Sequence, residues 1–423
     1  MTRSITFQMN QASEPANDNR LMKYQERAMT TASIDETYWK NVRDHFVLDP
    51  AIRFFNNGTA GPASKQVLDL HEKIDRQIAV SPFDPFLMDR IIETRTLLAE
   101  FVHADTDEVS FTHSTSEGMN IFAHGLDWKR GDEVILAKQE HFGGIQPYQT
   151  LEKRYGIKIV WIDFPLHPEH PDQILAAYRN AITPKTRVIV ASHVFYTTGL
   201  KAPIKELAAL AHENNILISV DGAQSFGVLP IHLRELGVDH YAGSGQKWLL
   251  AGTGTGFAYI AKHLQEMVWP LYGFDEYGKP SPYPISRYEK AGQPNIPAWL
   301  GIGAAIQLQN EIGKDAIENR VRDLSKHLRR GLETIPTLRF HTPKNQLLNA
   351  SLTTISLDHV TPETVVTTLV NKEKIYTRTI YDGGNSALRV STHFYNTPEE
   401  IDHLVSAIAA IADNPPEEIP RRH

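Results

Sequence analysis

A lysine and an aspartate lie where two neighbouring strands are predicted to end. Asp221 closes the apolar run 216–220, which is how a buried parallel strand brings a carboxylate to the edge of an α/β sheet. Lys247 follows a second short predicted strand, 241–244, and precedes a glycine-rich turn. Pyridoxal 5′-phosphate (PLP) requires a lysine for its Schiff base and an acid beside its pyridinium nitrogen. The pair therefore favours a PLP site, whereas a lysine alone is most often a solvated surface charge.

Polar residues also follow the other predicted strands of this region. Ligands bind outside the carboxyl ends of the strands in open α/β sheets, so these side chains are expected to meet at one edge. Each of five successive predicted strands is followed by a polar side chain: a hydroxyl residue, a histidine, a tyrosine, an acid with an amide, and a lysine. This coincidence is the strongest local indication of a ligand-binding site. The residues concerned are Thr115, Ser116, His141, Tyr196, Asp221, Gln224, Ser244 and Lys247.

Several of these residues have an ordinary structural explanation. Thr115 and Ser116 stand at a strand-to-helix turn, where small hydroxyl residues cap a helix or help its free N–H groups to bind phosphate. Beside Lys247 and Asp221 the phosphate interpretation is favoured. A histidine such as His141 is most often a hydrogen-bonded scaffold residue, but at a strand end its ring could stack on a pyridine or its nitrogen could carry a proton.

Two further residues outside the central strands are candidate substrate contacts. Arg389 lies in the predicted strand 388–391, and a buried arginine there needs an anionic partner. That partner is either a structural salt bridge or a substrate carboxylate held by the guanidinium. The turn 56–61 begins Asn-Asn-Gly, and turn chemistry accounts for its first asparagine. Asn57 could face a substrate.

The elements that position these residues follow from hydrophobic periodicity. Strands and helices alternate from about residue 105 to 260, which predicts a mostly parallel, doubly wound sheet. The last ninety residues instead predict an α+β domain, with strands near 337–340, 351–357 and 388–392. We predict a disordered arm at 1–30, an N-terminal segment packing on the small domain at 31–60, a large PLP-binding domain at 61–296, a small C-terminal domain at 297–413 and a tail at 414–423.

Composition excludes several classes of function. The 423 residues carry a net charge of −7 and give a pI near 6.3, so no basic surface for nucleic acid or anionic membrane is expected. No apolar run reaches the roughly 18 residues of a membrane span, and no secretory signal begins the chain, which predicts a cytoplasmic protein. The chain has no cysteine, which excludes disulfides, thiolate metal sites and a cysteine nucleophile or persulfide carrier; no metal site is predicted.

Taken together, the motifs resemble the class V aminotransferases of the aspartate-aminotransferase fold, the group that includes cysteine desulfurases, kynureninase and isopenicillin N epimerase. The resemblance runs from about residue 37 to about 410. It implies a PLP-dependent transferase of fold type I, an α/β protein with a large domain and a smaller C-terminal one. Its most specific pieces are Asp-Gly-Ala-Gln at 221–224, Ser-Gly-Gln-Lys-Trp at 244–248, Glu-His at 140–141, and Arg389 with Tyr-Asn-Thr-Pro-Glu-Glu at 395–400.

The resemblance also implies a role for each matching residue. Lys247 would form the Schiff base and act as general acid and base, Asp221 would keep the pyridine nitrogen protonated, and Gln224 would contact the phenolic oxygen. His141 would stack over the ring, and Arg389 would hold the substrate carboxylate. The phosphate would be bound by Thr115, Ser116 and Ser244, and by Gln293 reaching from the partner subunit of a homodimer.

Three positions depart from the pattern of the desulfurases. Gln246 stands where they usually have histidine; it can donate to phosphate but carries no charge. Tyr196 replaces the usual asparagine near the phenolic oxygen, and Gln293 replaces threonine. The 56–61 turn and the Lys247-Trp248 pair are closer to the isopenicillin N epimerase-like branch.

The sequence thus predicts a PLP-dependent enzyme acting at Cα or Cβ of an amino acid or an amino-acid-derived metabolite. The reaction would proceed through a Schiff base on Lys247 and Cα deprotonation, as in a C–S lyase, an epimerase or an aminotransferase. A PLP-fold scaffold or sensor without turnover is the alternative, and the intact lysine, acid and phosphate set disfavours it. A nucleotide-binding Rossmann protein is less favoured because no Gly-x-Gly-x-x-Gly turn follows the first strand.

Overall fold

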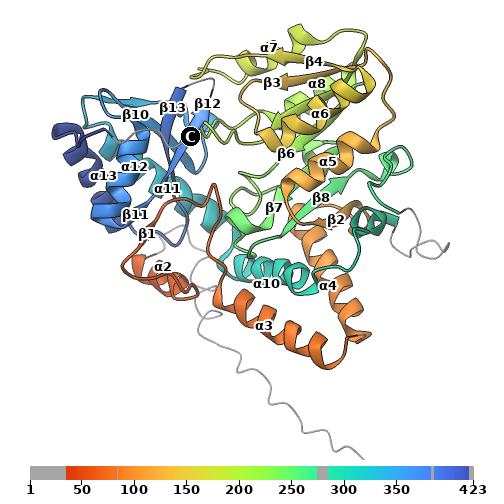
Figure 1. Ribbon diagram of the computed structural model, residues 1–423, viewed down its shortest axis with the longest axis horizontal. Helices are drawn as coiled ribbons and strands as arrows, with labels where there is room; N and C mark the ends of the chain where they lie inside the picture. Colours follow the sequence, from red (N-terminus) through yellow and green to blue (C-terminus); the bar gives the residue numbers. More distant parts are fainter. Residues whose placement is uncertain (1–34, 83, 274–283, 383–384, 419–423) are drawn as a thin grey trace, which may run out of the picture.

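The chain forms a large α/β body and a smaller α+β body packed side by side (Figure 1). The computed structural model describes residues 35–82, 84–273, 284–382 and 385–418. The arm predicted at residues 1–30 lies outside the described residues. Within them, no helix is both long and apolar enough to cross a membrane.

The large body is built on a seven-stranded sheet that is mostly parallel, which confirms the predicted fold class. Most of these strands are buried on both faces, as expected for a parallel sheet covered by helices. β8 alone runs against its neighbours β2 and β7; the sequence analysis assigned only a glycine-rich turn at its start. In spatial order the strands are β2 (Val109–Thr112), β8 (Gly256–Ile260), β7 (His240–Ser244), β6 (Leu217–Asp221), β5 (Thr186–Ser192), β3 (Glu133–Ala137) and β4 (Lys158–Ile162).

Helices follow most strands of this sheet and bury an apolar face against it. On α4, Leu87, Ile91, Leu98 and Phe101 are buried and form one stripe along the helix. Helical spacing of apolar residues gives such a stripe. The helices of the large body are α3 (Lys65–Val80), α4 (Phe86–Val102), α5 (Thr115–Gly125), α6 (Phe142–Tyr155), α7 (Asp172–Ala181), α8 (Ile204–Glu213), α9 (Leu233–Leu236) and α10 (Ile296–Ile312).

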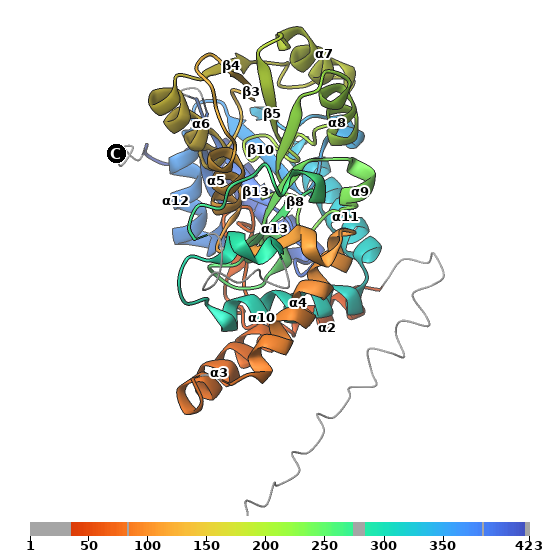
Figure 2. The same cartoon turned by 90° about the vertical axis from the view of Figure 1, so that its right-hand side faces the viewer.

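Helix α10 packs in the large body and not in the small domain to which the sequence analysis assigned it. It was assigned to the small domain, which was predicted to begin at residue 297. Instead Leu300, Ile302 and Ile306 belong to the same hydrophobic core as Val67 and Ile74 of α3. The helix is apolar nearly all round, so it needs partners on every side, and it lies beside α3 and α4 (Figure 2). The other domain boundaries remain a prediction.

The small body contains a four-stranded antiparallel sheet covered by helices. Its own core includes Leu324, Leu328, Ile355, Val390 and Ile408. The sequence analysis did not predict β12, which forms one edge of this sheet. The elements are α11 (Lys314–Leu332), β9 (Leu338–Phe340), β10 (Leu352–Leu357), α12 (Pro362–Glu373), β12 (Arg378–Asp382), β13 (Asn385–Ser391) and α13 (Pro398–Asp413), and the sheet order is β12-β13-β10-β9.

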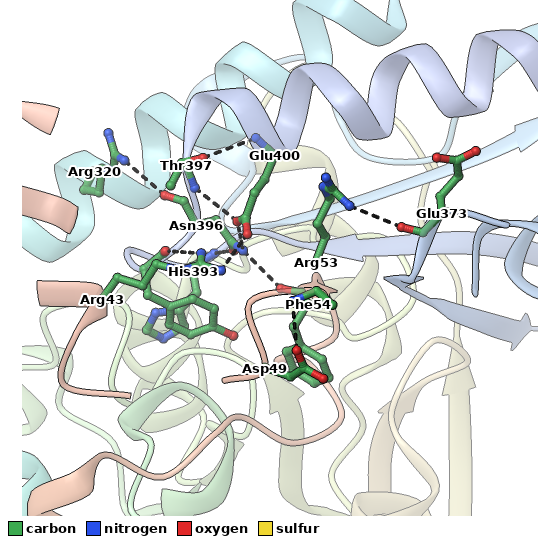
Figure 3. Close-up of polar contacts among 12 residues, drawn as sticks. Arg43, Asp49, Arg53, Phe54, Arg320, Glu373, His393, Asn396, Thr397 and Glu400 are labelled. Carbon is green, nitrogen blue, oxygen red and sulfur yellow. Dashed lines mark hydrogen bonds and ion pairs between the residues drawn. The ribbon is translucent and has the colours of Figure 1, made fainter. Parts of the chain in front are cut away.

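The N-terminal segment, with α2 (Glu36–Arg43) and β1 (Arg53–Phe54), is held against the small body. β1 pairs in parallel with β11 (Ile375–Tyr376). Figure 3 shows that Asn396, just before α13, connects the two parts: its Nδ2 donates to Phe54 O (3.1 Å) and its carbonyl accepts from Arg320. Because the turn 56–61 follows β1 directly, this attachment carries that turn to the junction between the two bodies.

Candidate active site

A cavity of about 480 Å³ lies between the carboxyl ends of the large sheet and strands β12 and β13 of the small body. The predicted site residues converge here from both parts of the fold. Ten of the twelve line the cavity, namely Thr115, Ser116, His141, Tyr196, Asp221, Gln224, Ser244, Gln246, Lys247 and Arg389. Asn57 and Gln293 do not line it.

Lys247 sits on a single π-helical turn, Gly245–Leu249, directly after β7. Isolated π turns occur frequently at functional sites. Leu250 ends the turn in the left-handed region with φ 67°, and Ala251 N donates to Gly245 O (2.9 Å). Gly61 N also donates to Gln246 O (2.8 Å). The lysine backbone is therefore held by contacts within the turn and by the distant N-terminal segment.

The Lys247 amine has no acidic partner within ion-pair distance among the described residues. Burial lowers its pKa to about 8; Asp221 opposes this shift and Arg389 adds to it. Burial disfavours the ammonium because the charged form loses more solvation than the neutral one. The neutral amine, which is the nucleophile and the base, is thus accessible at mildly alkaline pH.

Asp221 ends β6 with only 4% of its surface exposed. Its Oδ1 accepts a hydrogen bond from Ala223 N (2.9 Å), and no described residue donates to Oδ2. Gly222 is required beside it, because a Cβ there would stand 2.1 Å from the ring of Tyr241. A buried carboxylate with one oxygen free and no basic partner at ion-pair distance in the described chain suits the N–H of a pyridinium ring.

His141 caps helix α6, with Nδ1 accepting from Gly143 N (3.1 Å). Burial lowers the pKa of His141 to about 4, with Asp221 opposing and Lys247 reinforcing the shift. The ring is therefore neutral at pH 7, and with Nδ1 used as an acceptor its proton is assigned to Nε2. Tyr196 meets this ring edge-on at 4.9 Å with an interplanar angle of 89°. The Phe142 ring also lies against the imidazole, with centroids 4.0 Å apart and an interplanar angle of 37°, and His141 lines the cavity between these neighbours.

The predicted phosphate-binding residues meet at the N-terminus of α5. Thr115 Oγ1 and Ser244 Oγ are 2.7 Å apart, and Thr115 N also donates to Ser244 Oγ (3.3 Å). Ser116 keeps its hydroxyl open because Gly143 has no Cβ; one there would stand 2.3 Å from Ser116 Oγ. Gln246 also lines the cavity, and the Nε2 group of its amide is the part that can donate to a phosphate. Hydroxyls, an amide and a helix N-terminus together form a suitable phosphate cradle.

Arg389 lies on the opposite wall and is only 2% exposed. Nη1 donates to Tyr196 O and Nη2 to Thr59 Oγ1, both at 3.1 Å, while Nε–H is buried without a partner. Burial, and next the positive charge of Arg378, lower the Arg389 pKa to about 10. None of the described acids forms an ion pair with it, so the structural salt bridge considered from sequence is not found.

Three predicted residues have contacts that bear on their roles. Gln224 lines the cavity but is bonded at both ends, donating from Nε2 to Gly58 O and accepting at Oε1 from Trp248, each at 2.9 Å. Asn57 is fully buried, donating from Nδ2 to Lys247 O (3.3 Å) and accepting at Oδ1 from Tyr395. These bonds support a positioning role for Asn57 and give no support to the substrate contact that we expected. Gln293 is exposed on the surface.

Some cavity residues were missed by the sequence analysis. Arg378, Thr379, Ile380 and Tyr381 enter the wall because they lie on β12, a strand that was not predicted. The β-branched pair Thr379 and Ile380 was an available strand signal. Thr59 belongs to the 56–61 turn, but nothing local in the sequence indicates that its hydroxyl meets Arg389.

The geometry defines a PLP site of fold type I, with a strand-end lysine, a buried aspartate and a hydroxyl-rich helix N-terminus. The family profile of the class V aminotransferases (Aminotransferase class-V) matches residues 63–404. The chain therefore belongs to this family, and its cofactor is PLP. The predicted family, fold class and cofactor are confirmed.

Relatives of known name show the range of chemistry in the family. Isopenicillin N epimerase of Streptomyces clavuligerus is 30% identical over 390 residues, covering 88% of this chain and 98% of the relative. A probable cysteine desulfurase of Pyrococcus abyssi is 27% identical, covering 87% and 96%. Among solved structures, C-DES with glycine covalently linked to its PLP cofactor is 26% identical with a TM-score of 0.80, covering 87% and 98%. The chain is thus a PLP-dependent enzyme of a family that processes small amino-acid-type molecules.

Proposed function

We propose that this enzyme removes the Cα proton of an amino-acid-type substrate while retaining the substrate carboxylate. The observation that carries the proposal is Arg389, a buried guanidinium on the cavity wall with no acid beside it in the described chain. An unpaired buried cation is costly, and a bound carboxylate would supply the missing partner through a charge-assisted hydrogen bond. Retention of the carboxylate favours proton chemistry at Cα over decarboxylation.

The residues of the cavity divide into a cofactor group and a proton-transfer group. Thr115, Ser116, Ser244 and Gln246 would hold the phosphate, and Asp221 would hold the ring nitrogen. When bound, PLP withdraws electrons from Cα of the substrate and so acidifies its C–H bond.

Lys247 would attach the cofactor and later accept the Cα proton with the same amine. Its lowered pKa of about 8 suits a base working near neutral pH. His141 would lie over the cofactor ring, and its neutral imidazole adds no charge against the ring. The Nε2–H proton is available for donation on that side.

Once Lys247 has removed the Cα proton, three reactions are compatible with the residues of the cavity. Return of the proton to the opposite face of Cα gives an epimerase, return at a different carbon gives an aminotransferase, and loss of a β-substituent gives a lyase. The identity to isopenicillin N epimerase supports the first, and likeness to the cystine C–S lyase C-DES supports the third. Because the chain lacks cysteine, a persulfide on one of its own thiols is not part of the proposal.

The test is the visible absorbance of the purified protein before and after a panel of L- and D-amino acids and cysteine S-conjugates. We expect a yellow protein, bleached by borohydride, whose band shifts with one ligand class. Inversion at Cα with deuterium uptake identifies an epimerase, and a keto acid formed while the amino group stays on the cofactor identifies an aminotransferase. A keto acid formed together with ammonia and released thiol identifies a lyase. A ligand-induced shift without any of these products would favour the non-catalytic sensor, and a protein that stays colourless with added PLP would overturn the proposal.

The proposal includes a homodimer in which Gln293 reaches the phosphate of the partner subunit. Its support is the exposed position of Gln293 just before α10, outside the cavity of its own chain, and the pattern of the family that the chain resembles. Sedimentation equilibrium at micromolar concentration should give twice the chain mass. A monomeric species that binds PLP fully would contradict it. Cytoplasmic location and the absence of a nucleic-acid partner remain predictions from composition.

A further inference from the structure

Arg378 and Arg389 stand directly opposite each other in the small sheet. They are Cα partners in the antiparallel ladder of β12 and β13. Directly opposed residues of an antiparallel pair project from the same face, with Cα atoms about 4.5–5.5 Å apart. Both arginines line the cavity, so two guanidinium groups enter the same wall side by side.

This arrangement is unfavourable for the protein alone. Like charges directly opposite in a ladder destabilise the sheet, and Arg378 contributes to lowering the pKa of Arg389. No carboxylate among the residues that the structure describes forms an ion pair with either arginine. A charge on an edge strand such as β12 can discourage strand-to-strand aggregation, but that role does not require a position inside the cavity opposite a second arginine.

The two arginines differ in how they are held. Arg389 is buried and oriented by Tyr196 O and Thr59 Oγ1, whereas Arg378 is exposed to the cavity and none of the described groups accepts a hydrogen bond from its guanidinium. An oriented arginine suits a group in one constant position, as the α-carboxylate of every substrate would be. A long side chain free to move suits a second anion whose distance from Cα is set by the substrate.

We propose that Arg378 binds a second, distal carboxylate, so that the substrate is an amino acid or amino-acid derivative with two carboxylates. The inference rests on the proposed function for its use of Arg389 at the α-carboxylate. Arg378 would thereby determine specificity without taking part in proton transfer. Ile380 and Tyr381, also on β12 and in the wall, would contact the carbon chain between the two acids.

The experiment measures binding to the PLP-loaded enzyme by calorimetry, using glutarate as the diacid and pentanoate as the monoacid of the same chain length. The variants are Arg378→Gln and Arg389→Gln. Arg339→Gln is the matched control, because Arg339 lies on β9, the other edge of the same sheet, and is paired with Asp358. Wild type and control should prefer glutarate at least tenfold.

In Arg378→Gln, glutarate binding should weaken about 10- to 100-fold, while pentanoate binding changes less than twofold. Equal weakening of both acids would mean that the arginines share one carboxylate, and no change would mean that Arg378 binds no anion; either result overturns the inference. Neither ligand carries an amine, so the test is separate from turnover. Arg378-dependent glutarate binding in a protein that acts on no amino acid would refute the proposed function and leave this inference standing.

Discussion

Two buried arginines, Arg95 and Arg389, differ in whether the protein supplies an acid to neutralise their charge. Arg95 on α4 forms a double ion pair with Glu289, with Nη1 2.5 Å and Nη2 2.8 Å from the two carboxylate oxygens, and also donates to Val109 O. Glu289 accepts from Phe111 N as well (2.6 Å). Arg389, equally buried, has only neutral acceptors, and Nε is without a hydrogen-bond partner in both arginines.

The difference separates framework from function. At Arg95 the charge is neutralised within the chain, and the pair joins the turn η4 (Pro284–Glu289) to strand β2 beneath the sheet. At Arg389 no acid of the described chain neutralises the charge, so the guanidinium is available to an anionic ligand. Burying a charge without a partner costs desolvation free energy. Because the same cavity contains a lysine and a histidine with shifted pKa values, the unpaired charge indicates a ligand-binding site.

The largest effect is expected at Lys247, the proposed reactive residue, which lines the same cavity as Arg389. Lys247→Ala should lower turnover at least about 10⁴-fold, equal to about 5.4 kcal/mol of activation free energy, because the same amine attaches the cofactor and moves the proton. Steady-state kinetics would measure this. The free energy of unfolding should stay within about 1 kcal/mol of wild type, and a variant retaining a tenth of the activity would contradict the assignment.

Breaking the Arg95–Glu289 ion pair should lower the free energy of unfolding and leave the catalytic rate unchanged. Arg95→Met leaves the Glu289 carboxylate buried and unpaired, so we expect a loss of about 3–5 kcal/mol in the free energy of unfolding. Urea denaturation gives this value, and kcat per folded molecule should equal that of wild type. The double variant Arg95→Met/Glu289→Gln should lose less than the single one, because it removes both charges. A larger loss in the double variant would show that the pair is not the cause.

Removing Arg389, the arginine without an acidic partner, should weaken substrate binding and leave the free energy of unfolding nearly unchanged. Arg389→Gln should weaken amino-acid binding by about 2–5 kcal/mol, as measured by spectral titration of the PLP-loaded enzyme. Its free energy of unfolding should change by less than about 1 kcal/mol or rise, since a desolvated charge is removed. Unchanged affinity would refute the carboxylate clamp, and a stability loss like that of Arg95→Met would make Arg389 a framework residue.

The smallest effect is on the pH dependence of cofactor capture. The Lys247 pKa of about 8 predicts that the rate of PLP attachment to cofactor-free protein rises tenfold per pH unit below 8 and levels off above it. Arg389 lowers this pKa, so Arg389→Gln should move the midpoint upward. The double variant at Arg95 and Glu289 should keep the wild-type midpoint, because that charge is already neutralised. Stopped-flow absorbance from pH 6 to 9 would detect either shift.

Much of the fold was predictable because its signals are local. The strands predicted at 216–220, 241–244, 337–340, 351–357 and 388–392 are present as β6, β7, β9, β10 and β13, with ends displaced by a few residues. β8 and β12 were missed, and α10 was grouped with the wrong core. Whether a helix that is apolar all round joins one core or another depends on contacts distant in sequence, which no local pattern contains.

The sequence by itself determined that the chain is a PLP enzyme of the α/β type, because Asp221 and the proposed catalytic residues His141 and Lys247 lie at or just after the ends of buried strands. Strand polarity then places them at one edge of the sheet. Only the tertiary structure decided which charges are neutralised. Arg95 has its acid 194 positions away, Asn57 supports the Lys247 backbone across 190, and Arg378 opposes Arg389 through strand register. The first two pairings depend on how distant segments pack, and the third depends on the register of two consecutive strands. The identity of a residue does not reveal whether its partner lies within the chain or in the ligand.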